Sequence, residues 1–242
     1  MQITVTFVGS GDAFGSGGRL QTCILVQAGM LQFTLDFGTT SLVGLRRLGL
    51  DPNGVDGVIL THLHGDHCGG VPFLLLDAML GAHRTRPLTI IGPRGTADHL
   101  RALQEALFPG SAGMVPQFPL QMLEMAPGEP LHWQALRIHA VEARHTRETH
   151  PLAVRIDTGG KTLAYTGDGE LTSGLAALVE GVDLLVAECY FYEKPVKWHM
   201  NYPEIAGLSA RRVVLTHMHD DMLAHVDQVA ETCAYDGLVL TV

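Results

Sequence analysis

The sequence predicts an α/β protein in which helices cover two paired sheets. Apolar runs of strand length recur in both halves of the 242-residue chain and alternate with helical segments, a pattern typical of helices layered on sheets. An apolar strand that ends in Thr-His also occurs twice, at residues 58–62 and 213–217. We therefore expect a histidine at the end of a buried strand in each half.

The first half is expected to contain several short strands and two amphipathic or partly polar helices. The strands are recognised by alternating or continuous apolar residues bounded by turn residues. They are predicted at residues 1–8, 23–26, 31–35, 58–60 and 88–91. The helices are predicted at residues 41–48 and 96–107.

Two segments of the first half have unusual composition. Residues 71–80 are apolar nearly all round, and a helix without a polar face is either buried or part of an interface. From this segment we expect a contact between two copies of the chain, in a homodimer. Residues 108–130 hold five prolines and several glycines, so we expect a loop-rich excursion that overhangs the functional site.

The second half returns to strands and ends with helices. Period-two alternation or continuous apolar runs predict strands at residues 136–140, 152–156, 163–165, 182–187 and 212–215. Helices are predicted at residues 202–210 and 221–231. No repeat of fixed period is seen, and we expect residues 1–242 to form a single domain.

Composition limits the partners and the compartment. The net charge is −9 with neutral histidines, and no run of Lys or Arg stands out, so a long nucleic acid is not expected as a partner. A small anionic substrate remains acceptable.

There is no secretory signal or apolar run of transmembrane length, and four scattered cysteines, including Cys68 and Cys189, favour a reducing, cytoplasmic setting. Both are expected to be packing residues.

The most informative stretch is residues 61–67, Thr-His-Leu-His-Gly-Asp-His, directly after an apolar strand. If the strand reaches residue 61, His62 and His64 lie on one side, because side chains alternate with period two. Gly65 permits a tight turn that aims Asp66 and His67 at the same place. Imidazole and carboxylate suit zinc. Four ligands are too many for one zinc with an open position, which favours two metals.

The pattern T-H-x-H-x-D-H after a strand resembles the signature of the metallo-β-lactamase superfamily. The resemblance implies a four-layer αββα sandwich with a mono- or dinuclear metal site. It also implies further ligands near strand ends. His145 matches the next histidine, with His150 as its rival, and Asp168 in Thr-Gly-Asp matches a bridging carboxylate. His217 completes the set, while His219 resembles a residue outside the ligand set.

The resemblance implies two divalent metal ions, most often zinc, with manganese or iron as alternatives. The first ion's ligands are three histidines, His62, His64 and His145. The second ion's ligands are Asp66, His67 and His217, and Asp168 bridges the two ions. Two metals about 3.5–4 Å apart can share a hydroxide nucleophile and stabilise an in-line displacement at phosphorus. Asp66 is also expected to orient or deprotonate the attacking water.

The ribonuclease Z-like branch of the superfamily resembles this chain most. Glu188 and His199 match two catalytic positions of that branch, although Ala187 stands where a histidine is usual. By this resemblance His199 donates a proton to the leaving oxygen and Glu188 orients it. The other interpretation is that His199 caps the helix that follows Asn201. The glycine-rich residues 9–18 are either a flexible turn or, as in the branch, part of the substrate lining.

The expected function is a phosphodiesterase that acts on a small or cyclic phosphodiester. Transfer-RNA-processing members often carry a long arm between the positions of His145 and Asp168, and the stretch here is too short for one. Asp168 also argues against β-lactamase activity, since cysteine is common there in lactam-hydrolysing relatives. The alternative is a thioester, ester or lactone hydrolase of the glyoxalase II-like kind, in which His199 would matter less.

Overall fold

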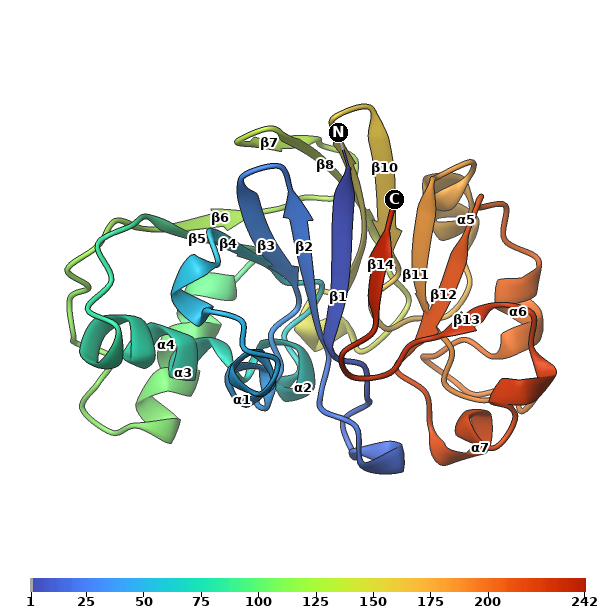
Figure 1. Ribbon diagram of the computed structural model, residues 1–242, viewed down its shortest axis with the longest axis horizontal. Helices are drawn as coiled ribbons and strands as arrows, with labels where there is room; N and C mark the ends of the chain where they lie inside the picture. The colour runs from blue at the N-terminus through green and yellow to red at the C-terminus, as the bar shows by residue number, and fades with distance from the viewer. Residues whose placement is uncertain (1) are drawn as a thin grey trace.

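The computed structural model of the protein describes residues 2–242. Within these residues the chain forms two seven-stranded sheets. Figure 1 shows the sheets side by side, with α1 to α4 beyond the first sheet and α5 to α7 beyond the second. This arrangement confirms the predicted four-layer αββα sandwich.

The first sheet has the strand order β14-β1-β2-β3-β4-β5-β6. Strands β14, β1, β2 and β3 pair antiparallel, and the strands from β3 to β6 pair parallel. In chain order the strands are β1 (Ile3–Gly9), β2 (Cys23–Ala28), β3 (Leu31–Leu35), β4 (Gly57–Ile59), β5 (Leu88–Gly92), β6 (Leu120–Glu124) and β14 (Val239–Thr241).

The second sheet has the order β13-β12-β11-β10-β9-β8-β7. Strands β7 to β10 pair antiparallel, and the strands from β10 to β13 pair parallel. In chain order the strands are β7 (Leu131–Trp133), β8 (Leu136–Glu142), β9 (Leu152–Thr158), β10 (Lys161–Tyr165), β11 (Leu184–Glu188), β12 (Val213–Thr216) and β13 (Thr232–Cys233).

Both sheets thus combine an antiparallel meander with a run of parallel strands. Parallel strands end at one edge of a sheet, which is where open α/β sheets bind ligands. Polar residues follow these ends in both sheets. They are Asp36 after β3, His62 after β4, Asp168 after β10, Glu188 in β11 and His217 after β12.

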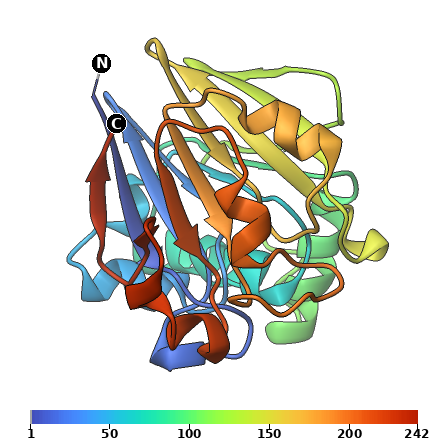
Figure 2. The ribbon, with the colours of Figure 1, turned by 90° about the vertical axis from the view of Figure 1, so that its right-hand side faces the viewer.

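Three apolar clusters hold the layers together. The first lies between the sheets and includes Val5, Phe7, Val154 and Val186. The second joins the first sheet to α1 (Ser41–Arg47), α3 (Val71–Leu76) and α4 (Thr96–Leu107). The third joins the second sheet to α5 (Ser173–Val179), α6 (Tyr202–Ala206) and α7 (Asp220–Leu223). Figure 2 shows α5 and α6 in front of the second sheet. No helix within residues 2–242 is long and apolar enough to cross a membrane.

The apolar segment 71–80 is mostly buried inside the chain. α3 ends at Leu76 and is continued by a π-helical turn, Asp77–Gly81. Val71, Leu74 and Leu75 belong to the core beneath the first sheet, whereas Leu80 is exposed. Packing within one subunit therefore explains the missing polar face, and the homodimer stays a prediction without support from this segment.

The helix predicted at residues 221–231 is wrong beyond its first turn. α7 ends at Leu223, and the chain continues through a 3₁₀ turn, Val226–Gln228, into β13. β13 begins directly after the predicted helix, and its Cys233 pairs with Leu215 of β12, so the residues before it lead the chain to the sheet edge. The helix predicted at residues 202–210 is also shorter and ends at Ala206.

The loop-rich excursion at residues 108–130 contains a strand that its prolines concealed. β6 pairs parallel with β5 and extends the first sheet. The residues after β6, Met125 to Pro127, line a cleft of about 610 Å³ together with Arg147 and His150. The end of the excursion therefore faces the loop that follows His145.

Candidate metal centre

The histidine motif forms the junction between β4 and a single helical turn, α2 (Gly65–Cys68). His62 is completely buried just after β4, and His64 has extended backbone angles at the N-cap of α2. Asp66 and His67 lie within α2, and both are buried. The predicted turn at Gly65 is thus a helical turn, which places all four side chains at the same end of the first sheet.

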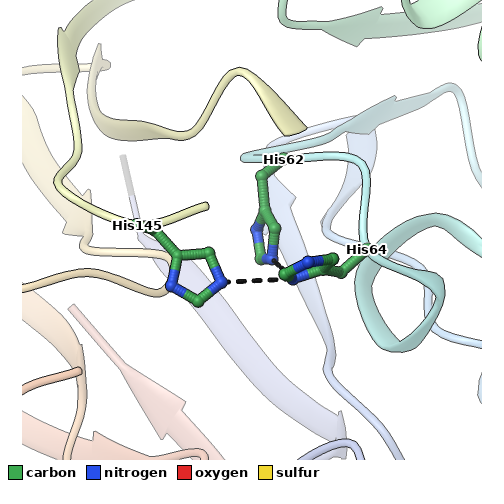
Figure 3. Close-up of side chains that lie close together, drawn as sticks. All are labelled: His62, His64 and His145. Atoms are coloured by element: carbon green, nitrogen blue, oxygen red, sulfur yellow. Dashed lines mark hydrogen bonds between the residues drawn. The ribbon is translucent and has the colours of Figure 1, made fainter. Parts of the chain in front are cut away.

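A three-histidine group consists of His62, His64 and His145. His64 Nδ1 lies 3.1 Å from His62 Nε2 and 3.1 Å from His145 Nε2. Figure 3 shows both contacts as dashed lines. The ligand atoms of the group all lie within 4.8 Å of one another. The first sheet supplies two of its members, and the end of β8 in the second sheet supplies His145.

A mixed group consists of Asp66, His67, Asp168 and His217. His67 Nε2 lies 3.2 Å from Asp66 Oδ2 and 3.4 Å from Asp168 Oδ1. His217 Nε2 lies 3.3 Å from Asp66 Oδ2 and 3.4 Å from Asp168 Oδ2. Asp168 therefore presents one carboxylate oxygen to each histidine.

The two groups are neighbours. The ring centroids of His62 and His67, one from each group, are 4.1 Å apart. The structure thus brings together all seven side chains that the sequence predicts as ligands.

Hydrogen bonds outside the groups orient the rings. His67 Nδ1 donates to Asp36 Oδ2 at 2.7 Å, and His145 Nδ1 donates to the Trp198 carbonyl oxygen at 2.9 Å. His62 Nδ1 lies 3.1 Å from Thr61 Oγ1. Each contact leaves the opposite ring nitrogen, Nε2, aimed at the group. Such outer partners fix the tautomer of a metal-binding histidine and raise its basicity.

Asp36 contacts a ligand residue of the mixed group, and the sequence analysis missed it. It is completely buried and accepts hydrogen bonds from the Thr61 backbone, from His67 and from Tyr165 Oη at 3.0 Å. A signal was present, because Asp36 directly follows the strand 31–35 as the predicted ligands follow theirs.

The surroundings push the histidine pKa values in opposite directions in the two groups. Burial, with the like charge of His67, holds the pKa of His62 well below its usual value. Burial also lowers the pKa of His64 and of His145. Burial alone would lower the pKa of His67 too, but Asp168, Asp66 and Asp36 outweigh it and raise that pKa well above 6.5.

The pKa values of Asp168 and His217 in the mixed group are shifted as well. Burial opposes ionisation of Asp168, but His217 and His67 outweigh it and hold the pKa of that carboxyl well below its usual value. The same carboxylate raises the pKa of His217 against the effect of burial. The mixed group is therefore an arrangement of opposite charges, and the three-histidine group an arrangement of neutral rings.

The donor set fits divalent metal ions. Asp168 Oδ1 is buried without a hydrogen-bond partner among residues 2–242, and an unsatisfied buried carboxylate oxygen is costly. Three imidazole nitrogens that converge on one point also cannot all donate to one another. A cation at each group resolves both problems. Residues His62, His64 and His145 would hold one ion, and Asp66, His67, Asp168 and His217 the other.

His199 and Glu188 lie beside the mixed group. His199 Nδ1 donates to Glu188 Oε2 at 2.8 Å and lies 3.9 Å from Asp168 Oδ2. Glu188 is completely buried and also accepts from the Gly169 backbone. Burial would lower the pKa of His199, but the Glu188 carboxylate and its hydrogen bond outweigh this and raise the pKa to about 9.

The capping alternative for His199 is not what the structure shows. Asn201 caps α6, since its side chain accepts from the Glu204 backbone and the Glu204 side chain accepts in return from the Asn201 backbone. The His199 ring instead stacks on Tyr190, with centroids 4.5 Å apart and planes 20° apart.

The rival histidines lie outside both groups. His150 is exposed and lines the cleft next to the loop. His219 is the N-cap of α7, where its Nδ1 accepts from the Asp221 backbone. Cys68 and Cys189 are completely buried in the helix-facing cores, as expected for packing residues.

The glycine-rich residues 9–18 support the end of β12. The carbonyl oxygen of Ser10 accepts from the His217 backbone and from Thr216 Oγ1. The Asp12 side chain accepts from Phe14 and Ser16 and thereby holds the loop in shape. The loop thus has a structural role at the metal centre, and its part in lining the substrate stays a prediction.

Comparison with known proteins agrees with this geometry. A family model described as the beta-lactamase superfamily domain matches residues 35–218. The chain belongs to this superfamily. The ribonuclease Z of Mycobacterium bovis (strain BCG / Pasteur 1173P2) is 28% identical over 193 residues, which cover 76% of this chain and 69% of the relative. These findings confirm the resemblance to the ribonuclease Z-like branch.

Solved structures share the superfamily fold. The metallo-beta-lactamase fold protein YhfI from Bacillus subtilis aligns with a TM-score of 0.81 at 23% identity and covers 100% of this chain and 99% of its own. Human tRNase Z, short form, aligns with a TM-score of 0.79 at 22% identity, over 98% of each chain. With the family match and the ligand groups, the chain is a metal-dependent hydrolase.

Proposed function

We propose that this hydrolase is a dinuclear phosphodiesterase that acts on a small or cyclic phosphodiester. The observation that carries the proposal is the pair His199 and Glu188, bonded at 2.8 Å beside the mixed group. Cleavage of a phosphodiester expels an alkoxide, which needs a proton donor. Hydrolysis of a thioester or activated ester expels a better leaving group and needs no such pair.

Divalent ions held by the two groups, zinc being the first choice, would supply the Lewis acidity for attack of water on phosphorus. Asp66 uses Oδ2 in its contacts with His67 and His217. Its other oxygen, Oδ1, is then available to orient the attacking water and accept its proton. Asp168 contacts both histidines of the mixed group and is the proposed bridge.

His199 is the proposed proton donor at its Nε2 atom. The hydrogen bond to Glu188 engages Nδ1, so the ring is held with Nε2 on the opposite side. The Glu188 carboxylate stabilises the imidazolium, which keeps His199 protonated at neutral pH. Bound cations would lower the pKa of His199 from its raised value toward neutrality and make the proton easier to transfer.

Two observations support a small substrate over a long RNA. The stretch between His145 and Asp168 is occupied by β9 and β10, which pair across the turn at Gly159 and Gly160. The net charge of −9 is also unfavourable for a long polyanion. The relatives' name, ribonuclease Z, points to RNA cleavage in those proteins, so RNA belongs among the tested substrates.

The test combines metal analysis with a leaving-group series. Wild type is expected to bind about two metal ions per chain and to hydrolyse both bis(p-nitrophenyl) phosphate and alkyl phosphodiesters. His199→Ala should lower turnover of alkyl diesters by roughly 10²–10⁴-fold, because their leaving groups need a proton, and affect the nitrophenyl ester far less. His150→Ala, which removes an exposed histidine outside both groups, serves as the matched control.

Each other outcome contradicts one part of the proposal. Equal turnover of alkyl diesters by wild type and His199→Ala would overturn the proton-donor role. Cleavage of a thioester or lactone without phosphodiester turnover would favour the glyoxalase II-like alternative. Preferential cleavage of a precursor transfer RNA would replace the small substrate by a nucleic acid.

A further inference from the structure

The loop that follows β11 carries two aromatic–ammonium pairs at the protein surface. Lys197 Nζ lies 4.5 Å from the ring centroid of Trp198, and Lys194 Nζ lies 4.8 Å from that of Phe191. Two of the three lysines in this acidic sequence are therefore in one short loop. We refer to Phe191, Lys194, Lys197 and Trp198 as the aromatic ledge.

Two backbone hydrogen bonds hold Trp198 between Glu170 and His145 of the metal centre. Its backbone N–H donates to Glu170 Oε1 at 2.9 Å, and its carbonyl oxygen accepts from His145 Nδ1 at 2.9 Å. Its φ is 73°, a left-handed conformation that glycine adopts readily and a bulky side chain rarely does. An indole is nevertheless held there, one residue before His199, with 43% of its surface exposed.

The ledge lies beside His199, the residue proposed to protonate the leaving oxygen. If His199 protonates the leaving oxygen, the group attached to that oxygen extends past His199 toward its neighbours. Tyr190 places the Phe191 end of the ledge beside His199, since its ring centroid lies 4.5 Å from that of His199 and 4.9 Å from that of Phe191. An exposed indole stacks well on a planar base, and ammonium groups attract an anionic ester.

We propose that the aromatic ledge is a subsite for a nucleoside base, with Trp198 as its stacking residue and Lys197 as its charge. The inference rests on the phosphodiesterase function proposed above and names its substrate class, a nucleoside cyclic phosphate. The base stacks on the indole while the cyclic phosphate lies at the metal centre.

The first test compares substrates with and without a base. Adenosine 2′,3′-cyclic phosphate carries one, and glycerol 1,2-cyclic phosphate does not. Trp198→Gly removes the indole ring and introduces glycine, which adopts a φ of 73° readily. The backbone contacts to Glu170 and His145 should therefore persist. The ratio of kcat/KM for the adenosine ester to that for the glycerol ester should fall about tenfold. Trp198→Phe should restore most of the ratio.

A matched pair of variants tests the charge. Lys197→Met should lower kcat/KM for both cyclic phosphates about threefold, because both carry the same anionic ester, whereas Lys161→Met, which removes the same charge at the start of β10, should change neither value. An effect of equal size in both variants would show that overall charge, and not the ledge, is responsible.

The second test does not depend on turnover. Trp133 is buried, so quenching of tryptophan fluorescence by adenosine 3′-monophosphate would report on Trp198. Quenching that weakens in Lys197→Met but not in Lys161→Met is expected. If wild type cleaves neither cyclic phosphate but shows this quenching, the proposed reaction fails and the subsite stands. An unchanged ratio in Trp198→Gly and no quenching would overturn the subsite.

Discussion

The three-histidine group and the mixed group are neighbours in space but opposites in charge. His62, His64 and His145 are neutral rings whose pKa values are lowered by burial. In the mixed group, carboxylates raise the pKa of His67 and of His217. The hydrogen-bond partners outside the groups also differ in charge, since His67 donates to a carboxylate and His145 to a neutral backbone carbonyl.

The difference teaches that the two metal ions proposed above would meet unlike sets of ligands in one fold. Neutral imidazoles are ready to bind a cation, because metal ligands must be deprotonated. The mixed group has more negative charge, but protons on its histidines must leave first. We therefore expect the groups to differ in affinity, in pH dependence and in sensitivity to substitution.

The largest effect is expected from the residue proposed to join the two groups. Asp168→Ala should lower phosphodiester turnover by at least roughly 10³-fold, because both oxygens face histidines of the mixed group. Elemental analysis should show that Asp168→Ala has lost at least the metal ion of the mixed group. Asp157→Ala, a partly exposed carboxylate on β9, is the control. Retention of both ions and of turnover in Asp168→Ala would end the bridging proposal.

A smaller effect is expected from the outer partner of His67. Asp36→Asn keeps the shape of the side chain but removes its charge, so metal affinity of the mixed group should fall by about 10–100-fold. The affinity can be measured by competition with a coloured chelator. Thr61→Val removes the contact to His62 and a hydroxyl hydrogen bond to Asp36, but it leaves the Asp36 charge and the backbone bond in place, so it should cost less. A larger loss in Thr61→Val would reverse the contrast between the groups.

The smallest effect concerns pH. Because carboxylates raise the pKa values of His67 and His217, these rings keep their protons to higher pH than a free imidazole, and metal binding should release protons from them. Affinity of the mixed group should rise with pH until the raised pKa is passed. The three-histidine group, with lowered pKa values, should change little above about pH 6.5. Proton release can be followed with an indicator dye during metal titration.

Two ligand variants assign this proton release to a group. His145→Gln disables the three-histidine group and should keep the release, whereas His217→Gln should diminish it. Equal release in the two variants would mean that the charge contrast does not survive in solution.

The sequence predicted the fold and the ligand set because both depend on local patterns. His62, Asp168 and His217 each follow a strand of a parallel run, and parallel strands end at one edge of a sheet. His145 follows β8, which runs in the same direction as β10 because both pair antiparallel with β9. α4 was predicted at its observed bounds, since its amphipathic pattern is continuous from Thr96 to Leu107.

The missed features depend on contacts that are distant in sequence. Asp36 is linked to the site by hydrogen bonds from His67 and from Tyr165, which lies 129 residues away. The predicted helix 221–231 ends early because the chain leads instead to β13, which pairs with β12 at the sheet edge. The left-handed conformation of Trp198 follows from the bonds that hold its backbone to Glu170 and His145. Periodicity within a window of residues carries no information on any of these.

Each ligand group draws on both sheets, and this has a mechanical consequence. His64 and His145 are 81 residues apart in sequence, and His67 and His217 are 150 residues apart. An ion bound at either group is then a cross-link that closes a long loop of the chain, which restricts the unfolded state strongly. Removal of the ions by a chelator should therefore weaken the connection between the two sheets, and amide protons near the ends of β4 and β12 should exchange faster.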